Sequence, residues 1–157
     1  MPITRESQYV REQALQLGIS QISGASRTSV GGYTEEIRPT DTEQFDVSDQ
    51  RTLDEVIRWL MECEHIPSFC TACYRAGRTG DRFMSFCKSG EILNYCHPNA
   101  LMTLSEYLVD YASPETAEKG WRMIADELAE IPDAHRRDVC AANIEAIRSG
   151  DARDFRF

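Results

Sequence analysis

The sequence predicts an α/β fold in which the last strands of a parallel sheet precede a mainly α-helical module that carries cysteines. Three observations support this fold: a strand–helix–strand pattern near the N-terminus, a long polar loop, and apolar residues at helical spacing through the C-terminal two-thirds. We expect the domain boundary near the end of the loop. The predicted domains are therefore 1–48 and 49–157.

The first domain is expected to hold two strands joined by a helix. Pro2–Thr4 is interpreted as the end of one strand, Ser7–Leu17 as a helix that Gly18 ends, and Ile19–Ser23 as a second strand. This pattern is typical of parallel β/α architecture. Because two parallel strands cannot bury both of their faces, the remaining strands are expected upstream in a larger protein or in another chain.

A loop over residues 24–50 separates this pattern from a series of helices. Loops of this length are uncommon in compact domains and are usually functional or linkers. The helices that follow are marked by signals typical of helix N-termini. These signals are the capping boxes Thr52–Glu55 and Thr103–Glu106, the pair Ser113–Pro114, and a restart at Pro132–Asp133.

The composition argues against several classes of protein. Of the 157 residues, 41 % are hydrophobic and 27 % are charged, as in ordinary globular chains. No apolar stretch approaches the roughly 18 residues of a membrane span, and the N-terminus has no hydrophobic signal core. A net charge of −9 without a Lys/Arg run argues against nucleic acid as a partner. We therefore expect a cytoplasmic protein that binds neither membranes nor nucleic acid.

Cysteine spacing carries the chemistry of this sequence. Cys70 and Cys73 form a CxxC motif, and Cys96 follows after 22 residues. Three thiolates with one open position are typical of a 4Fe-4S cluster that has one differentiated iron. The alternative is a tetrahedral zinc site in which Cys87 is the fourth ligand. Cys140 stands apart among small apolar residues and is interpreted as a buried hydrophobic side chain.

Three arginines follow the CxxC motif directly. They are Arg75, Arg78 and Arg82, with Gly77 and Gly80 between them. A three-thiolate cluster has a net negative charge, which guanidinium groups nearby would stabilise, and the glycines would let the backbone approach an inorganic core. The arginines are therefore predicted to surround the cluster, although a solvated basic loop is an alternative.

These motifs resemble the C-terminal domain of the HydG family of radical-SAM tyrosine lyases, which mature FeFe-hydrogenase. The resemblance covers nearly the whole chain and weakens after about Ser113. The matching segments around the cysteines are Cys70-Thr71-Ala72-Cys73-Tyr74-Arg75, Gly77-Arg78-Thr79-Gly80, Phe83-Met84 and Cys96-His97-Pro98-Asn99-Ala100, and the upstream ones are Thr4-Arg5-Glu6-Ser7, Leu17–Gly24 and Ser26–Tyr33.

The resemblance implies a function. In this family a TIM-type barrel binds a 4Fe-4S cluster and S-adenosylmethionine (SAM), and splits tyrosine into p-cresol and dehydroglycine. That fragment becomes carbon monoxide and cyanide at an auxiliary 4Fe-4S cluster in the C-terminal domain. By resemblance, Cys70, Cys73 and Cys96 ligate this cluster, whose open iron would bridge to a further iron, and residues 1–48 are the last β/α elements of the barrel with a linker.

One departure from the family pattern limits this implication. The CxxxCxxC motif of the SAM-binding cluster is absent from the sequence. The chain alone is therefore not expected to cleave SAM or tyrosine, and is interpreted as a truncated product or as half of a split enzyme. Its expected partners are the missing barrel portion, hydrogenase maturation proteins and tyrosine-derived small molecules.

Two further site residues follow from the barrel interpretation. Active sites of such barrels lie at the C-terminal ends of the strands, where Arg5 and Ser23 are found. They could bind the carboxylate of an amino-acid substrate or its fragment. Two other functions remain open for the chain: a stand-alone iron-sulfur module that acts in trans, and a zinc-stapled helical interaction domain.

Overall fold

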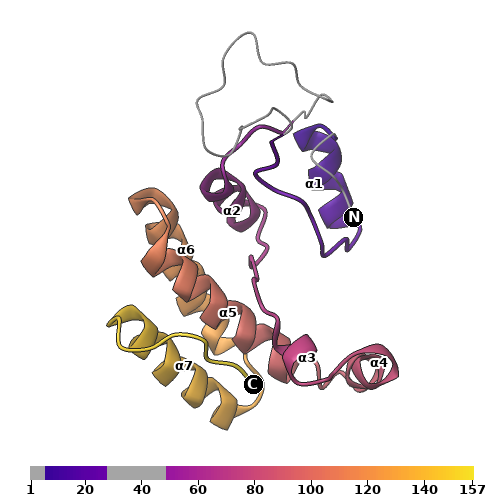
Figure 1. Ribbon diagram of the computed structural model, residues 1–157, viewed down its shortest axis with the longest axis vertical. Coiled ribbons are helices and arrows are strands. Elements are labelled where there is room, and N and C mark those ends of the chain that lie inside the picture. The colour runs from indigo at the N-terminus through magenta and orange to yellow at the C-terminus, as the bar shows by residue number, and fades with distance from the viewer. Residues whose placement is uncertain (1–5, 28–48) are drawn as a thin grey trace. The chain divides into compact units, whose positions relative to one another are not determined.

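The computed structural model describes residues 6–27 and 49–157 (Figure 1). Within these ranges the secondary structure is α-helical, and no strand occurs. The helices are α1 Gln8–Gln16, α2 Leu53–Glu62, α3 Ala72–Arg75, α4 Gly80–Ser89, α5 Leu93–Asp110, α6 Pro114–Ala129 and α7 Ala134–Arg148. The chain divides into two units, Met1–Val56 and Ile57–Phe157, which are described separately.

The predicted α/β fold class is wrong for the described chain. Ile19–Ser23, the predicted second strand, has no strand structure, and Pro2–Thr4 lies outside the described residues. A β-strand requires a neighbouring strand to pair its N–H and C=O groups, and the described residues provide none. Instead, the carbonyl oxygen of Ser23 accepts a hydrogen bond from the Arg11 guanidinium at 2.5 Å.

The first unit is organised around that buried arginine. Arg11 projects from α1, which Ser7 caps by accepting a hydrogen bond from the backbone N–H of Val10. Its guanidinium also forms an ion pair with the buried carboxylate of Asp49, which Arg51 engages at 2.7 Å. Arg11 therefore joins three segments of the first unit through polar contacts. They are helix α1, the segment around Ser23, and the residues that begin at Asp49.

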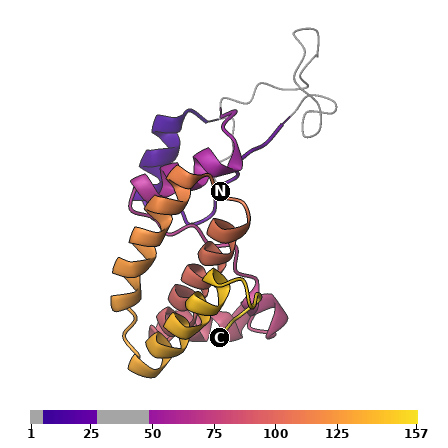
Figure 2. The ribbon, with the colours of Figure 1, turned by 90° about the vertical axis from the view of Figure 1, so that its left-hand side faces the viewer.

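The second unit contains a bundle of α5, α6 and α7, which lie side by side in Figures 1 and 2. The sequence explains its helix starts: Ser113 caps α6 with Pro114 in the first turn, and the Asp133 carboxylate accepts from the backbone N–H of Arg136 at 2.8 Å. Its core consists of apolar side chains from all three helices and the adjoining segments. They include Leu101, Met102, Leu104, Leu108, Ile124, Ile131, Cys140, Ile144 and Ile147.

Of the two predicted capping boxes, one is confirmed and one is wrong. At the start of α2, the Glu55 carboxylate accepts from the backbone N–H of Thr52 at 2.7 Å, while Thr52 Oγ1 accepts from the N–H of Glu55 at 3.3 Å. Thr103 instead lies inside α5, where its hydroxyl donates to the carbonyl oxygen of Asn99 at 3.0 Å. Such a contact within a helix satisfies the hydroxyl without marking a helix start.

Helix α5 continues through Pro98, although proline is unfavourable inside a helix. Proline has no N–H to donate to the carbonyl oxygen four residues earlier, which here belongs to Asn94. Arg136 of α7 replaces the missing donor, since its Nη1 lies 3.0 Å from that oxygen. A contact between two helices therefore makes proline acceptable inside this one.

The C-terminal segment 149–157 runs back along α5 in the opposite direction. Arg153 pairs with Asp110 at the end of α5, the backbone N–H of Asp154 donates to Glu106 one turn earlier, and Phe157 reaches Asn99. The tail, yellow in Figures 1 and 2, thus connects the end of the chain to the part of α5 that follows Cys96. Among the described residues no helix is both long and apolar enough to cross a membrane.

Candidate metal centre

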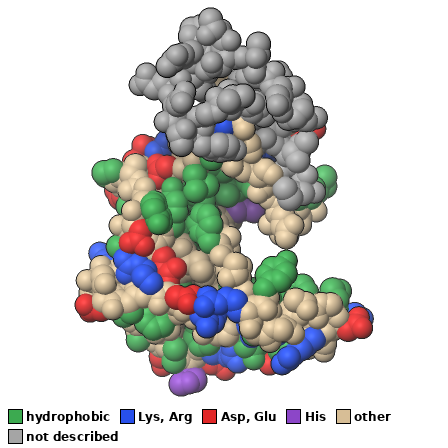
Figure 3. All heavy atoms as spheres, viewed as in Figure 1, with side chains coloured by type: hydrophobic (Ala, Val, Ile, Leu, Met, Phe, Trp, Pro, Cys, Tyr) green, Lys and Arg blue, Asp and Glu red, His purple; other side chains and the backbone are tan. Residues whose placement is uncertain are grey.

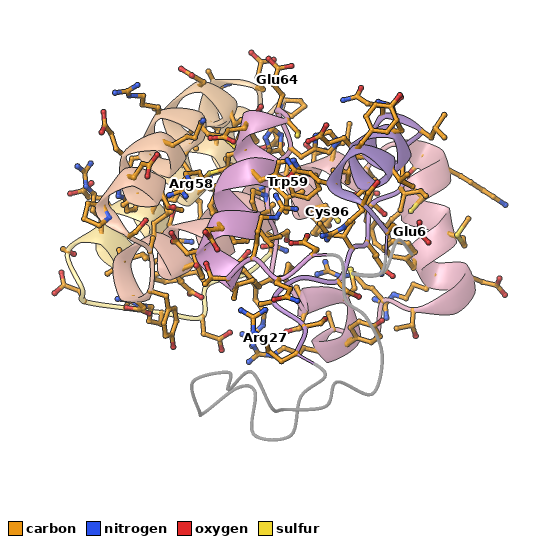
Figure 4. The ribbon with its side chains drawn as sticks, turned by 90° about the horizontal axis from the view of Figure 1, so that it is seen from above. Glu6, Arg27, Arg58, Trp59, Glu64 and Cys96 are labelled. Carbon is orange, nitrogen blue, oxygen red and sulfur yellow. The ribbon has the colours of Figure 1, made fainter. Side chains whose placement is uncertain are left out.

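The cysteines predicted as ligands lie on consecutive elements of the second unit. Cys70 precedes α3, Cys73 is in α3, Cys87 is in α4 and Cys96 is in α5, where it is labelled in Figure 4. All four are free thiols. The Sγ atom of Cys70 accepts a hydrogen bond from the backbone N–H of Ala72 at 3.4 Å. N–H donors of this kind are among the features that tune cluster-ligating sulfurs.

The electrostatics of Cys96 show that these thiols share one neighbourhood. The Cys96 side chain is exposed, but the protein atoms packed around its sulfur partly desolvate it and raise its pKa. The negative charges of Cys73, Cys70 and Cys87 raise the pKa further, whereas the Arg78 guanidinium opposes them. Both charge effects require these groups to lie near the Cys96 sulfur. The charge of Cys87 also acts on Cys96, so a fourth thiol lies near the other three. These four thiols are the ligands of the alternative zinc site.

The described residues show no preformed site for a single metal ion. Within 6–27 and 49–157, no three Cys, His, Asp or Glu side chains converge closely enough to hold one metal ion. In a cubane cluster each thiolate binds a different iron, so its ligands stay farther apart than those of a single ion. The chemistry of the donor set, thiols with the Arg78 guanidinium near them, is compatible with such a group. The assignment of Cys70, Cys73 and Cys96 as the three ligands stays a prediction.

The three predicted arginines have different surroundings. Arg78 is buried, and its guanidinium donates from Nη2 to the main-chain oxygen of Phe157 at 2.6 Å. Arg75 is exposed and pairs with the Asp154 carboxylate, whose hydrogen bond raises the pKa of the guanidinium. Arg82 is exposed on α4. Of the three, Arg78 is therefore the arginine whose charge acts on Cys96.

Sequence reasoning missed an aromatic and cationic group next to Cys96. The guanidinium of Arg78 lies 4.7 Å from the centroid of the Tyr95 ring, and that of Arg136 lies 4.1 Å from it. Phe86 of α4 contacts the same ring edge-on, with the centroids 5.4 Å apart. Nothing local in the sequence indicates Arg136, because it arrives from α7.

His97 and Cys140 contact other parts of the second unit. His97, considered above only as part of a family motif, faces α6, where its Nε2 is 3.0 Å from the Glu127 carboxylate. Cys140 is fully buried and burial raises its pKa to about 12, which confirms its prediction as an apolar residue. Ser23 belongs to the first unit and Arg5 lies outside the described residues, so a substrate role for either stays a prediction.

Comparison with known proteins finds strong similarity to a solved structure. No family model matches the sequence, and no curated protein does. Among solved structures, the chain is similar to the crystal structure of HydG, described as a maturase of the [FeFe]-hydrogenase. The TM-score is 0.89 at 47 % sequence identity, over 99 % of this chain and 33 % of that chain. The chain therefore spans about a third of the length of HydG, and it is related to a C-terminal portion of this maturase.

Proposed function

We propose that this chain is the part of a HydG-like maturase that holds an auxiliary 4Fe-4S cluster through Cys70, Cys73 and Cys96. The observation that carries the proposal is that Cys70 and Cys73 lie close enough to Cys96 for their charges to raise its pKa. The chain in which they do so is 47 % identical to HydG. When bound, the cluster would supply an iron without a protein ligand, on which carbon monoxide and cyanide derived from tyrosine are assembled.

The residues of the chain have separate tasks in this proposal. Three thiolates hold the cluster and leave one iron open, and the N–H of Ala72 orients the Cys70 sulfur. Arg78 balances the negative charge that three thiolates bring to a partly buried site. Radical cleavage of tyrosine requires a SAM-binding cluster, and its CxxxCxxC motif is absent from this sequence. We propose that a radical-SAM barrel supplies this step, in the same protein or in trans, and that other hydrogenase maturation proteins receive the product.

Anaerobic reconstitution of the chain with iron and sulfide tests the cluster. We expect about four irons per chain and an EPR signal after reduction with dithionite. Cys73→Ser should lose the cluster, whereas Cys140→Ala should keep it, because the Cys140 sulfur is buried in the helical core. A cluster that survives Cys73→Ser would contradict the ligand assignment.

A zinc-stapled domain is the second candidate, favoured by the influence of the Cys87 charge on Cys96. Metal analysis of the Cys87→Ala variant separates the two functions. A closed zinc site would lose its fourth ligand and its metal. A three-cysteine cluster would remain, so one zinc without iron in the unmodified chain would overturn the main proposal.

A further inference from the structure

Arg78 is positioned by a part of the chain that is remote in sequence. Its Nη2 donates to the main-chain oxygen of Phe157 at 2.6 Å. Asn99 holds the same residue from α5: its Oδ1 accepts from the backbone N–H of Phe157 at 2.9 Å, and its Nδ2 lies 3.5 Å from the Phe157 oxygen. Asn99 and Arg78 are 2 % and 8 % exposed, so solvent does not compete strongly for these contacts.

Arg78 has an unused hydrogen-bond donor. Its buried Nε–H has no hydrogen-bond partner among the described residues, and no acidic side chain there pairs with its guanidinium. Arg75 provides the contrast, because the Asp154 carboxylate compensates its charge. A buried cation with an unused donor is unfavourable unless an anionic group lies nearby. The cysteines can provide that group, because the backbone N–H of Arg78 donates to the carbonyl oxygen of Cys73 at 2.8 Å and its guanidinium lies 4.7 Å from the ring of Tyr95, the residue before Cys96.

Aromatic packing limits the movement of the guanidinium. Arg78 lies over the Tyr95 ring, and Arg136 lies over the same ring and 5.6 Å from the centroid of the Phe157 ring. Tyr95 directly precedes Cys96 in α5. The tail residue that orients Arg78 and the helix that presents Cys96 are therefore packed into one group.

We infer that Asn99 and the main chain of Phe157 are positioning groups, which hold Arg78 beside the cysteines so that its charge favours the reduced form of the bound cluster. The inference rests on the proposed function. Reduction adds a negative charge, which a fixed cation nearby stabilises. Asn99 contacts no cysteine in this scheme and acts only through Phe157 and Arg78.

Redox titration of the reconstituted chain tests the inference. We expect Arg78→Gln to lower the ratio of reduced to oxidised cluster at a fixed potential by roughly tenfold, or ~59 mV for one electron. Arg78→Lys should recover part of the shift. Arg122→Gln, which removes the same charge from an exposed site on α6, should leave the potential unchanged.

A double-mutant cycle separates positioning from a general structural effect. Asn99→Leu should shift the potential in the same direction as Arg78→Gln, but should add nothing in the Arg78→Gln background. Asn143→Leu, a matched change at a half-buried asparagine of α7, should have no effect. If Asn99→Leu does not fold, Asn99→Ala provides the same comparison.

A second measurement uses the iron-free chain. The Nε–H proton of Arg78 should exchange slowly with solvent in NMR spectra, and faster in Asn99→Leu. An iron-free chain that takes up no cluster would overturn the proposed function together with this inference. Two outcomes would overturn the inference alone. In one, the potential of the cluster does not change in Arg78→Gln. In the other, Asn99→Leu still shifts the potential in the Arg78→Gln background.

Discussion

Two neighbouring regions of the second unit are ordered by different forces. In the bundle of α5, α6 and α7, apolar side chains such as Leu101, Leu104 and Ile147 are completely buried. In the cysteine segment, residues 70–90, only Ala72 and Arg78 are buried, and one of these is a cation. Figure 3 shows apolar side chains exposed on this segment, where Tyr74 is 78 % and Met84 is 47 % exposed.

The difference indicates where the stability of each region originates. Burial of apolar surface stabilises the bundle independently of any ligand. The cysteine segment depends on polar and ring contacts with α5 and the tail, such as Arg78 with Phe157 and Phe86 with Tyr95. In the proposed function, the cluster would add three covalent attachments to this segment. Segments with few buried apolar contacts open at low free energy, which suits a site that must be loaded.

Thiol reactivity should separate the two regions most strongly. In the iron-free chain, iodoacetamide at pH 8 should modify Cys73 and Cys87 at least about a thousandfold faster than Cys140, which reacts only when the bundle opens. The buried Cys140 thiol, with its pKa of about 12, also forms little thiolate at that pH. Mass spectrometry of peptides over time measures this ratio. Similar rates for all three would show that the bundle is no more stable than the cysteine segment.

The next largest effect is expected on the free energy of unfolding when a buried apolar side chain is shortened. Leu101→Ala should lower the free energy of unfolding by about 3–5 kcal/mol, because the side chain is completely buried and leaves a cavity. Met84→Ala on α4 is the matched change in the cysteine segment, and should alter stability by less than about 0.5 kcal/mol. Urea denaturation measures both variants. Equal losses would contradict the distinction between the regions.

A smaller effect is expected at the contact between Gly120 of α6 and Leu108 of α5. A Cβ atom added at Gly120 would lie 2.5 Å from Leu108 Cδ1, so Gly120→Ala overpacks the contact. The net loss should be about 1–2 kcal/mol, since alanine recovers some helix propensity. Leu108→Val should relieve part of the overlap in the double variant. A more stable Gly120→Ala in urea denaturation would show that the helices can separate without loss.

The smallest effect concerns the attachment of the tail to the cysteine segment. The hydrogen bond from Arg75, followed by contacts with Arg156, lowers the pKa of Asp154 to about 2. Because this pKa is below the usual value near 4, the attachment is complete above about pH 4 and is lost as the pH falls toward 2. Asp154→Asn should remove that dependence, and asparagine also tolerates the positive φ of 65° at this position.

Hydrogen exchange of tail amides between pH 5 and pH 2 can test this expectation. After correction for intrinsic rates, protection should fall with pH in the unmodified chain, and should start lower and fall less in Asp154→Asn. Asp110, whose pKa is lowered by the Arg153 hydrogen bond, contributes in the same direction and remains in both chains. Unchanged protection at low pH in the unmodified chain would mean that other contacts hold the tail.

Sequence reasoning succeeded where the signal was local. The capping box at Thr52, the N-caps Ser113 and Asp133, and the apolar character of Cys140 each follow from a few neighbouring residues. It was wrong for Ile19–Ser23, since alternation favours a strand only if a partner strand exists. It was also wrong for Thr103, whose hydroxyl found an acceptor inside the helix.

The sequence by itself determined the starts of α6 and α7 and the relation to HydG, because capping residues and cysteine spacing can be read along the chain without knowledge of its packing. Only the tertiary structure decided which arginine faces the thiols. Arg75 and Arg78 are equivalent in the sequence, but the tail returns along α5 so that Asp154 neutralises the first and Phe157 orients the second. Contacts between residues that are remote along the chain depend on how the helices pack, which no local pattern encodes.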